Sequence, residues 1–257
     1  KRQTYTIPRI MNSAVSSAIS IGLGVRGPNF TLNTACASGG NAVGLAMQWI
    51  REGRLRAVLC GGAEAPVTYG LLRAWDALGV LSRKYNETPE NACRPFDKNR
   101  SGFVLAEGAA VLVLESLESA NKRNATVFGE IVGFGSNCDA SSLTNPDENG
   151  VVESMKLALD DAEISPNSIG YINAHGTGTR LNDPLECRAI HRVFGDRSVK
   201  LPVSSSKSLF GHAMGASSAL EALATLLAVQ NDCAPPTLNC DDLDPECVID
   251  PVPYNSR

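Results

Sequence analysis

Two of the three histidines in this 257-residue chain lie in glycine-rich segments where side chains could do chemistry. His175 belongs to the sequence NAHGTGT, and His212 follows a glycine in KSLFGHAMGA. A glycine beside a histidine lets a backbone or a substrate approach closely, and ligands of α/β proteins bind where strands end. Both segments lie at predicted strand-to-helix junctions, so these imidazoles are predicted to be functional. His191 lies inside the helical run CRAIHRVF and is predicted to be structural.

The third candidate group is the thiol of Cys36, which stands among small residues in TACASGG at the predicted start of a helix. Backbone N–H groups and the dipole at a helix N-terminus stabilise a thiolate, so we expect the pKa of Cys36 to be lowered. Small neighbours leave room for a bulky substrate to reach the sulfur. The pattern favours a nucleophile; a small buried cysteine that packs in a helix turn is the alternative.

The elements that must position these groups follow from apolar periodicity. Predicted helices cover 41–51, 117–122, 151–162, 184–194 and 215–230. Predicted strands cover 57–62, 109–115, 127–135, 169–174 and 202–205, after a short β-rich run over 25–33. Alternation of strands and helices predicts an α/β fold of mainly parallel sheets covered by helices. The pattern restarts near residue 125, which predicts two related halves: 1–124 with Cys36, and 125–257 with both active histidines.

Four ordered motifs resemble those of elongating β-ketoacyl-(acyl carrier protein) synthases of the thiolase superfamily. TACASGG, NAHGTGT and KSLFGH resemble the nucleophile, first-histidine and lysine/second-histidine motifs, and the run RPFDKNRSGFVLAEGAAVLVLE over 94–115 resembles a further signature. His175 follows Cys36 by 139 residues, and His212 follows His175 by 37. The resemblance covers nearly the whole chain and implies a thiolase-like, layered α-β-α-β-α fold.

The resemblance also implies an activity, that of an acyltransferase which condenses by decarboxylation. Cys36 would take an acyl chain from a carrier-protein thioester. His175 and His212 would donate hydrogen bonds to the thioester oxygen of a malonyl unit and stabilise the enolate formed as carbon dioxide leaves. The carbanion would attack the acyl-Cys carbonyl. This chemistry needs no metal and no organic cofactor in the enzyme, because phosphopantetheine of the carrier holds the substrates.

Supporting residues are likewise implied by the resemblance, position by position. Lys207 matches the lysine of the family, and Glu186 matches the acid with which it is expected to pair, orienting the histidines. Asp183 matches a helix-capping and network position. Asn173 and Glu221 match positions that help hold a structural monovalent cation in some members.

Composition and charge limit the partners. The chain is 43% hydrophobic and 5% aromatic with a net charge of −4, which gives no basis for nucleic-acid binding. Apolar runs are too short to span a bilayer, and no cleavable signal is seen, so we expect no membrane and a cytoplasmic (or organelle stroma or matrix) location. We expect a homodimer that receives its substrates from an acidic acyl carrier protein, and the first 60 residues, which are rich in basic side chains, are predicted to supply part of the docking surface. These side chains are Lys1, Arg2, Arg9, Arg26, Arg51, Arg54 and Arg56.

The eight cysteines form no CxxC pair, so free, buried thiols in a reducing compartment are expected, and the acidic loop between Cys240 and Cys247 is not predicted to bind zinc. The resemblance further implies that the chain is truncated at both ends, because a leading strand and a C-terminal glycine-rich loop with a gatekeeper phenylalanine are expected outside it. Unpaired sheet edges are expected in such a fragment.

Several alternatives remain at this point. Thiolases pair the active cysteine with His and a second Cys, and initiating synthases pair it with His and Asn. A silent chain-length subunit lacks the nucleophile, so Cys36 argues against it. A modular polyketide synthase would more usually carry glutamate where this chain has Asn173. A binding scaffold without chemistry also remains, as do fatty-acid and polyketide pathways.

Overall fold

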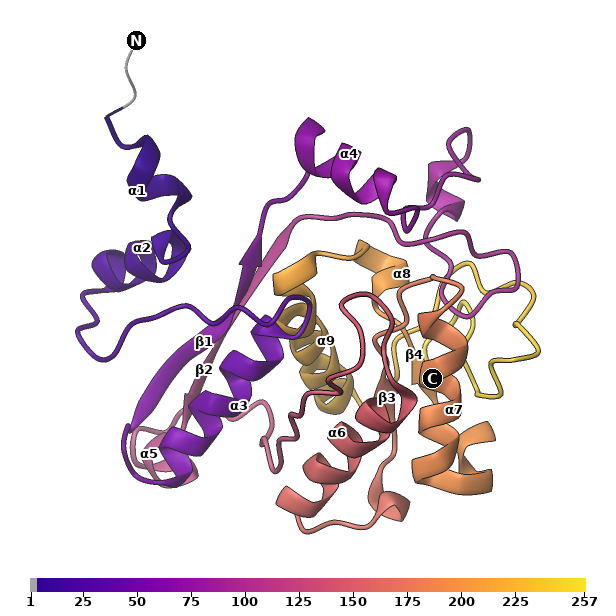
Figure 1. The fold of residues 1–257 in the computed structure, drawn as a ribbon. Coiled ribbons are helices and arrows are strands. Elements are labelled where there is room, and N and C mark those ends of the chain that lie inside the picture. Colours follow the sequence, from indigo (N-terminus) through magenta and orange to yellow (C-terminus); the bar gives the residue numbers. More distant parts are fainter. Residues whose placement is uncertain (1–3) are drawn as a thin grey trace.

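Strand β1, Ala57–Glu64, pairs along its full length with strand β2, Gly108–Glu115, in the computed structural model, which describes residues 4–257. A second, short sheet is formed by β3, Ile172–Asn173, and β4, Val203–Ser204, which pair in parallel. These two sheets lie in different halves of the chain, and helices cover them (Figure 1).

Helices account for most of the regular structure. Their bounds are α1 Thr6–Ile10, α2 Ala14–Leu23, α3 Ser38–Arg51, α4 Tyr69–Ala77, α5 Leu117–Lys122, α6 Glu148–Asp161, α7 Asn182–Phe194, α8 Lys207–Phe210 and α9 Ser217–Asn231. Helix α3 packs against β1 and against α9, and α9 also contacts β2, so α3 and α9 join the two halves (Figure 1). Helices α6 and α7 pack on each other beside β3 and β4.

Side-chain caps explain where several helices begin. Thr68, Ser116 and Asp147 precede α4, α5 and α6, and each accepts a hydrogen bond from a backbone N–H of the first helical turn. Such a cap satisfies a donor that has no partner within the helix. Asp147 thereby starts α6 three residues before the predicted start at 151.

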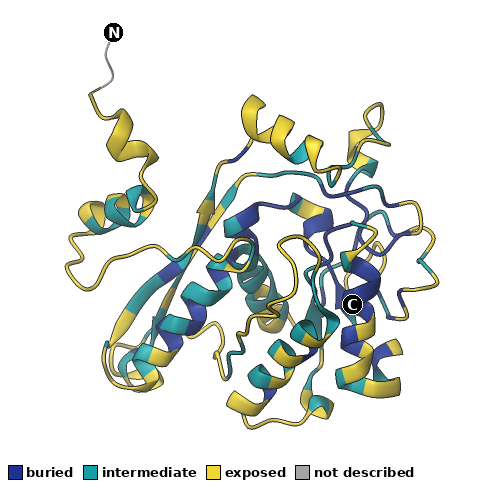
Figure 2. Cartoon of the chain, in the orientation of Figure 1, coloured by how far each residue is buried: buried dark blue, intermediate teal, exposed yellow. Residues whose placement is uncertain are grey.

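Two buried clusters form the core. The larger surrounds α7 and the β3–β4 sheet and consists of Phe96, Ala174, Cys187, Ile190, Val203, Cys240, Cys247 and Ile249. The smaller, between α3 and β1, consists of Val43, Ala46 and Cys60. Helices α1 and α2, by contrast, bury none of their residues and stand away from the body (Figure 2).

The expectation of mainly parallel sheets differs from the pairing of the longest strands. β1 and β2 are antiparallel, with Ala57 opposite Glu115 and Glu64 opposite Gly108. The chain leaves β1 at Glu64, makes an excursion through α4, and returns at the same end of the pair, so the strands run in opposite directions. Only the two-residue pairing of β3 with β4 is parallel among the described strands.

The predicted strand over 127–135 is wrong, because this segment has no regular structure. A strand needs a neighbour that exchanges backbone hydrogen bonds. Side chains serve this segment instead: Phe134 donates its backbone N–H to Asp161 at 2.9 Å, and the carbonyl of Val132 accepts from Arg51 at 3.0 Å. The β-rich run over 25–33 likewise contains no strand, and the strands predicted over 169–174 and 202–205 are each reduced to two residues.

The predicted helices all exist; the helix predicted over 117–122 is found with these bounds as α5, and the other four begin at different residues. Helix α3 begins at Ser38 rather than at 41, and α7 begins at Asn182 rather than at 184. Helix α9 begins two residues later than predicted, after a 3₁₀ turn over Met214–Ala216. Helices α1, α2, α4 and α8 were not predicted; of these, α1, α2 and α4 have no buried residue.

A tight approach of α3 to α9 yields the first prediction. A β-carbon at Gly39 would lie 2.7 Å from the backbone nitrogen of Ala219, whereas one at Gly40 would lie 3.4 Å from Ser218 Cβ. We therefore expect Gly39→Ala to lower the free energy of unfolding by about 1–3 kcal/mol through overpacking. Gly40→Ala, the matched control, should be neutral or stabilising by up to about 1 kcal/mol, since alanine favours helix. Urea unfolding measures both; equal effects would contradict the packing argument.

Candidate active site

The turn that carries Cys36 is held by short hydrogen bonds just before α3. Ala35 has a φ of +51°, a left-handed conformation that is unusual for alanine and that strains the residue before the thiol. The side chain of Ser38 fastens this turn, since its Oγ donates to the carbonyl of Ala35 at 2.7 Å and accepts from the N–H of Thr34 at 2.9 Å. Ser218 of α9 donates to the carbonyl of Cys36 at 3.0 Å, which ties the turn to the other half.

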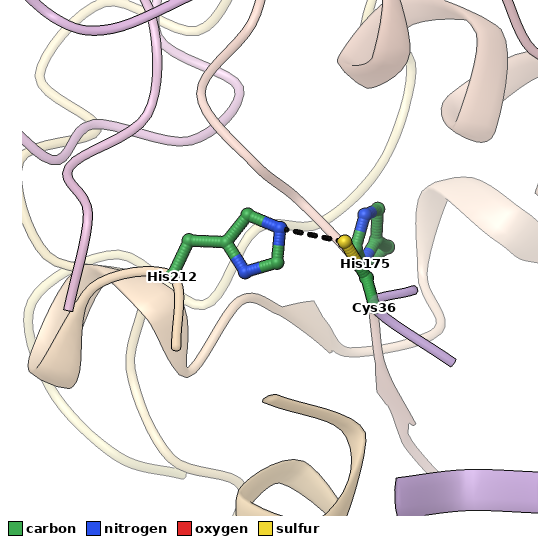
Figure 3. A group of neighbouring side chains, drawn as sticks. All are labelled: Cys36, His175 and His212. Atoms are coloured by element: carbon green, nitrogen blue, oxygen red, sulfur yellow. Dashed lines mark hydrogen bonds between the residues drawn. The ribbon is translucent and has the colours of Figure 1, made fainter. Parts of the chain in front are cut away.

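His212 reaches the thiol from the segment between α8 and α9. Its Nε2 lies 3.1 Å from Sγ of Cys36 (Figure 3). The backbone at His212 is fixed on both sides, because its N–H donates to the carbonyl of Val104 at 2.7 Å and its carbonyl accepts from Ala106 at 3.0 Å. The Nδ1 atom lies 2.7 Å from Oγ of Ser217. The imidazole is therefore held at both nitrogens and at its backbone.

His175 completes the group from the loop that follows β3. Its ring and that of His212 stand nearly perpendicular, with centroids 5.4 Å apart. Ligand atoms of Cys36, His175 and His212 all lie within 4.8 Å of one another (Figure 3). Residues 139 and 37 positions apart in sequence thus meet around one point, as the mechanism implied by the motifs requires.

Lys207 holds His175 from the buried side. Its ammonium lies 3.1 Å from Nδ1 of His175 and donates to the carbonyl of the same residue at 2.6 Å. The expected pairing of Lys207 with Glu186 is wrong: its carboxylate partner is Glu221 of α9. Lys207 is fully buried, and 13% of the Glu221 side chain is exposed.

Glu186 has a different task. Its carboxylate accepts from the backbone N–H groups of His175 at 2.6 Å and of Gly176 at 2.8 Å. Asn182 adds a contact at 3.3 Å. These hydrogen bonds let the carboxylate of Glu186 fix the loop that carries His175. Glu186 therefore orients the backbone of this loop and is not the partner of Lys207.

Asp183 is a network residue but does not cap its helix. It lies inside α7, whose N-cap position is Leu181, and it is fully buried. Its carboxylate accepts from the N–H of Phe96 at 2.8 Å and from that of Gly178 at 3.2 Å. Asp183 therefore joins the 94–115 signature to the His175 loop.

The two residues predicted to help hold a monovalent cation, Asn173 and Glu221, differ in whether they are free to bind one. The Nδ2 atom of Asn173 donates to Oγ of Ser206 at 2.6 Å, while its Oδ1 is buried without a partner. A buried, unpartnered carbonyl oxygen suits a cation ligand. The carboxylate of Glu221, however, is already engaged by Lys207. Asn173 fits a cation site in the described part of the chain, and Glu221 fits one less well, so the cation remains a prediction.

Burial controls the electrostatics of the site. It raises the pKa of Cys36, against the lowering effect of Lys207, so the expected low pKa is corrected: removal of the thiolate from water outweighs its favourable surroundings. Burial and then Lys207 lower the pKa of His212 to about 3, and the same causes, in that order, lower that of His175 well below its usual value. Both imidazoles are neutral at pH 7.

These histidine pKa shifts predict a pH-dependent stability. In the unfolded chain His212 binds a proton near pH 6.5, and in the folded protein only near pH 3. Between these values the unfolded state holds more protons, so stability falls as the pH is lowered, by up to about 1.4 kcal/mol per pH unit for one group. We expect His212→Gln to flatten the stability profile between pH 6.5 and 4, measured by urea unfolding. An unchanged slope would contradict the neutral, buried imidazole.

His191 lies in α7 with its Nδ1 3.0 Å from Oγ of Ser198, outside the site. All eight cysteines are free; five are buried, but Cys138 is exposed, which corrects the expectation of buried thiols throughout. Across residues 4–257 no helix is long and apolar enough to cross a membrane.

Ser217 and Ser218 were not predicted as site residues. The one signal for them in the sequence was their place at the start of a helix beside His212.

The same three atoms are also a donor set that a transition metal accepts, because a thiolate and two imidazoles are ligands of zinc. Cys36, His175 and His212 form the one metal-capable cluster among the described residues. A chelator control therefore belongs in every assay of the site.

Comparison with known families identifies relatives of both halves. Residues 1–120 match the family described as "Beta-ketoacyl synthase, N-terminal domain", and residues 128–241 match "Beta-ketoacyl synthase, C-terminal domain". Among curated proteins, the chain is 44% identical over 257 residues to "Nodulation protein E" of Rhizobium leguminosarum bv. trifolii, covering all of this chain and 62% of that protein. It is 43% identical over 255 residues to "3-oxoacyl-[acyl-carrier-protein] synthase 2" of a Synechocystis species, covering 98% of this chain and 61% of that protein.

Solved structures give the same result. A ketosynthase of a type II polyketide synthase, solved in complex with its acyl-carrier protein and bound to the hexaketide, superposes with a TM-score of 0.96 at 34% identity, covering 99% of this chain and 63% of that one. A beta-ketoacyl synthase from Burkholderia phymatum superposes with a TM-score of 0.94 at 38% identity, covering 99% and 62%. These similarities confirm the predicted fold class. The chain spans about three fifths of the length of these relatives.

Proposed function

We propose, from the premise that this chain belongs to the β-ketoacyl synthase family, that it carries the reaction centre of a 3-oxoacyl-(acyl carrier protein) synthase. The observation that carries the proposal is the meeting of Cys36, His175 and His212 within 4.8 Å. A nucleophile and two neutral imidazoles around one point suit acyl transfer followed by stabilisation of an enolate.

The first half-reaction loads the enzyme. The Cys36 sulfur, 3.1 Å from Nε2 of His212, attacks the carbonyl of an acyl thioester and releases the proton of its thiol. The bond from the carbonyl to the carrier sulfur breaks, and the carrier thiol leaves with the proton. Because burial holds the resting group as a thiol, its proton has to be transferred in this step, and the departing carrier sulfur accepts it.

The second half-reaction forms the new carbon–carbon bond. Malonyl thioester loses carbon dioxide, and N–H groups of His175 and His212 donate to the oxygen of the resulting enolate. The enolate carbon attacks the acyl-Cys36 carbonyl, the bond to sulfur breaks, and a proton from solvent regenerates the thiol. The product is a β-ketoacyl thioester on the carrier. No metal or organic cofactor enters these steps.

The test is mass spectrometry of the acylated, full-length protein. Incubation with acyl-carrier substrates of increasing chain length should add one acyl group, at Cys36, and the preferred length distinguishes the fatty-acid from the polyketide use of the site. Covalent labelling by an epoxide inhibitor of the cerulenin type should occur at the same residue. Acylation elsewhere, or labelling without acyl transfer, would instead favour a scaffold that uses the fold without chemistry.

We further propose an acyl carrier protein as partner, a homodimer as assembly, the cytoplasm or an organelle stroma or matrix as location, and a division into halves at 124/125. The complex of a related ketosynthase with its carrier supports the first. The exposed apolar side chains of Val111 and Val113 on β2, and the outer backbone edge of the two-stranded β1–β2 sheet, support association of copies.

The basic residues of the first part of the chain need to be reconsidered for docking. Lys1 and Arg2 lie outside the described residues. Arg51 pairs with Asp161 at 2.8 Å, and Arg54 pairs with Glu52 at 2.6 Å. Arg51 is the last residue of the 14-residue α3 and Arg54 follows it, whereas Cys36 precedes the N-terminal end of this helix, about 21 Å away at 1.5 Å per residue.

Electrostatic attraction of the carrier to a basic surface can be tested without knowing which arginine is involved. If opposite charges attract the carrier, the Michaelis constant for carrier-bound substrate should rise several-fold between about 0.05 and 0.5 M salt, because screening shortens their range. Alkylation of Cys36 by a small neutral reagent, the control, should not change. A Michaelis constant that stays flat would contradict electrostatic docking, and charge reversal at Arg9, Arg26 and Arg56 one at a time would locate the surface.

A further inference from the structure

We propose that Ser217 is a positioning residue that donates a hydrogen bond to Nδ1 of His212 and thereby keeps the proton of this imidazole on Nε2. The inference rests on the proposed function and deepens it, since it assigns how one of the two enolate-stabilising donors is kept in the donating form. Nothing in the motifs required a hydroxyl at this position.

The geometry places the hydroxyl on the far side of the imidazole from the thiol. Oγ of Ser217 lies 2.7 Å from Nδ1 of His212, and Sγ of Cys36 lies 3.1 Å from Nε2. The 3₁₀ turn over Met214–Ala216 brings the chain back so that the first residue of α9 faces the ring. Ser217 has no exposed surface, and 3% of His212 is exposed, so water does not compete for this bond.

Burial also fixes the direction of the hydrogen bond. A serine hydroxyl has one proton to donate and two lone pairs to accept with. Within residues 4–257, Nδ1 of His212 is the sole hydrogen-bond partner of Ser217 Oγ. If the imidazole donated instead, the hydroxyl proton would be buried without an acceptor, which is unfavourable. The hydroxyl therefore donates, Nδ1 accepts, and the ring proton resides on Nε2.

His175 is held in the same form by a different group. The ammonium of Lys207, 3.1 Å from Nδ1 of His175, has protons but no lone pair, so this Nδ1 also accepts. Each imidazole thus receives a proton donor at Nδ1 and presents Nε2–H, the arrangement needed if both stabilise one enolate oxygen. Lys207 enforces it with charge, and Ser217 enforces it with a neutral hydroxyl.

Because the hydroxyl of Ser217 is neutral, this residue can be substituted without changing the charged groups of the site. The charged and titratable groups that face Cys36 and His212 are Lys207, Glu221, His175 and Glu64. Ser217→Ala changes none of them. Without the hydroxyl, however, His212 is free to place its proton on Nδ1, and Nε2 then becomes an acceptor.

The experiment separates donation by His212 from acceptance. Decarboxylation of malonyl carrier is measured in full-length Cys36→Gln protein, with and without Ser217→Ala. We expect kcat to fall about tenfold to a hundredfold, as on partial loss of one oxyanion donor, with KM unchanged. Alkylation of Cys36, measured in Ser217→Ala alone, should be unchanged or faster, because an unprotonated Nε2 assists the thiol. Ser217→Thr keeps the hydroxyl and should keep the wild-type ratio of the two rates.

The chain offers a matched control in Ser198 and His191. Oγ of Ser198 lies 3.0 Å from Nδ1 of His191, and Ser198 is equally buried, but this pair lies outside the site. Ser198→Ala should therefore lose a comparable amount of thermal stability and leave both rates unchanged. Equal loss of decarboxylation and alkylation in Ser217→Ala would show a merely structural role and overturn the proposal, as would an unchanged kcat.

Failure of the proposed function has a different signature. If Cys36→Gln protein with Ser217 intact releases no carbon dioxide, the decarboxylating function is wrong. The tautomer is then read from ¹⁵N chemical shifts of His212: a protonated Nε2 that is lost in Ser217→Ala supports the role of Ser217. A protonated Nδ1 in the wild type, or an unchanged pattern in Ser217→Ala, overturns it.

Discussion

Cys36→Ala is expected to leave a folded protein that no longer forms carbon–carbon bonds, with condensation reduced to less than about one thousandth. Among the described residues, Cys36 is the one cysteine whose thiol is hydrogen-bonded to an imidazole, at 3.1 Å. The turn is fixed by hydrogen bonds that do not involve the thiol, such as those to the carbonyls of Cys36 at 3.0 Å and of Ala35 at 2.7 Å, and these survive the substitution. Loss of the side chain should therefore remove chemistry rather than structure.

Cys36→Gln should separate the two half-reactions. The glutamine amide resembles the acyl-enzyme carbonyl, so acyl transfer should be abolished while malonyl decarboxylation is kept or raised. Carbon dioxide release and product formation are measured in parallel by radiolabel and mass spectrometry. Cys138→Ala, at an exposed free thiol, is the control and should behave as the wild type. Acyl label on Cys60 or Cys187 would show that the nucleophile is not Cys36.

Lys207→Met is expected to be the most destabilising single substitution at the site. It would leave the carboxylate of Glu221 buried without its ammonium partner, and breaking one side of a buried ion pair costs about 3–5 kcal/mol. His175 would also lose the donor at Nδ1 and a 2.6 Å hydrogen bond to its carbonyl. Urea unfolding should show the loss of stability, and condensation should fall even at temperatures where the variant is folded.

A second substitution tests whether the effect comes from the unpaired charge. Lys207→Met combined with Glu221→Gln should recover most of the stability and little of the activity, because the buried charge is gone while His175 remains unsupported. Lys98→Met is the control: its ion pair with Asp242 is 3.8 Å long and about 60% exposed on both sides, and such pairs contribute about 0–1 kcal/mol. A loss below about 1 kcal/mol in Lys207→Met would contradict the buried pair.

Local patterns were sufficient for the elements that build the site. The apolar periodicity over 215–230 predicted α9, and the run over 184–194 predicted α7, since a helix that buries one face repeats its apolar residues every three to four positions. The segment over 127–135 is richer in β-branched and aromatic residues than β1, yet forms no strand. Strand formation depends on a partner that is distant in sequence, which composition does not reveal.

The sequence by itself determined the reacting groups: Cys36, His175 and His212 were recognisable because each stands in a short motif of small residues, and such motifs are local. Only the tertiary structure decided which charge neutralises Lys207. Glu186 and Glu221 are both carboxylates near a motif, and burial beside α9 selects Glu221. The direction of the Cys36 pKa shift was likewise decided in three dimensions, since desolvation depends on the elements that cover the thiol and outweighs the helix terminus that the sequence shows.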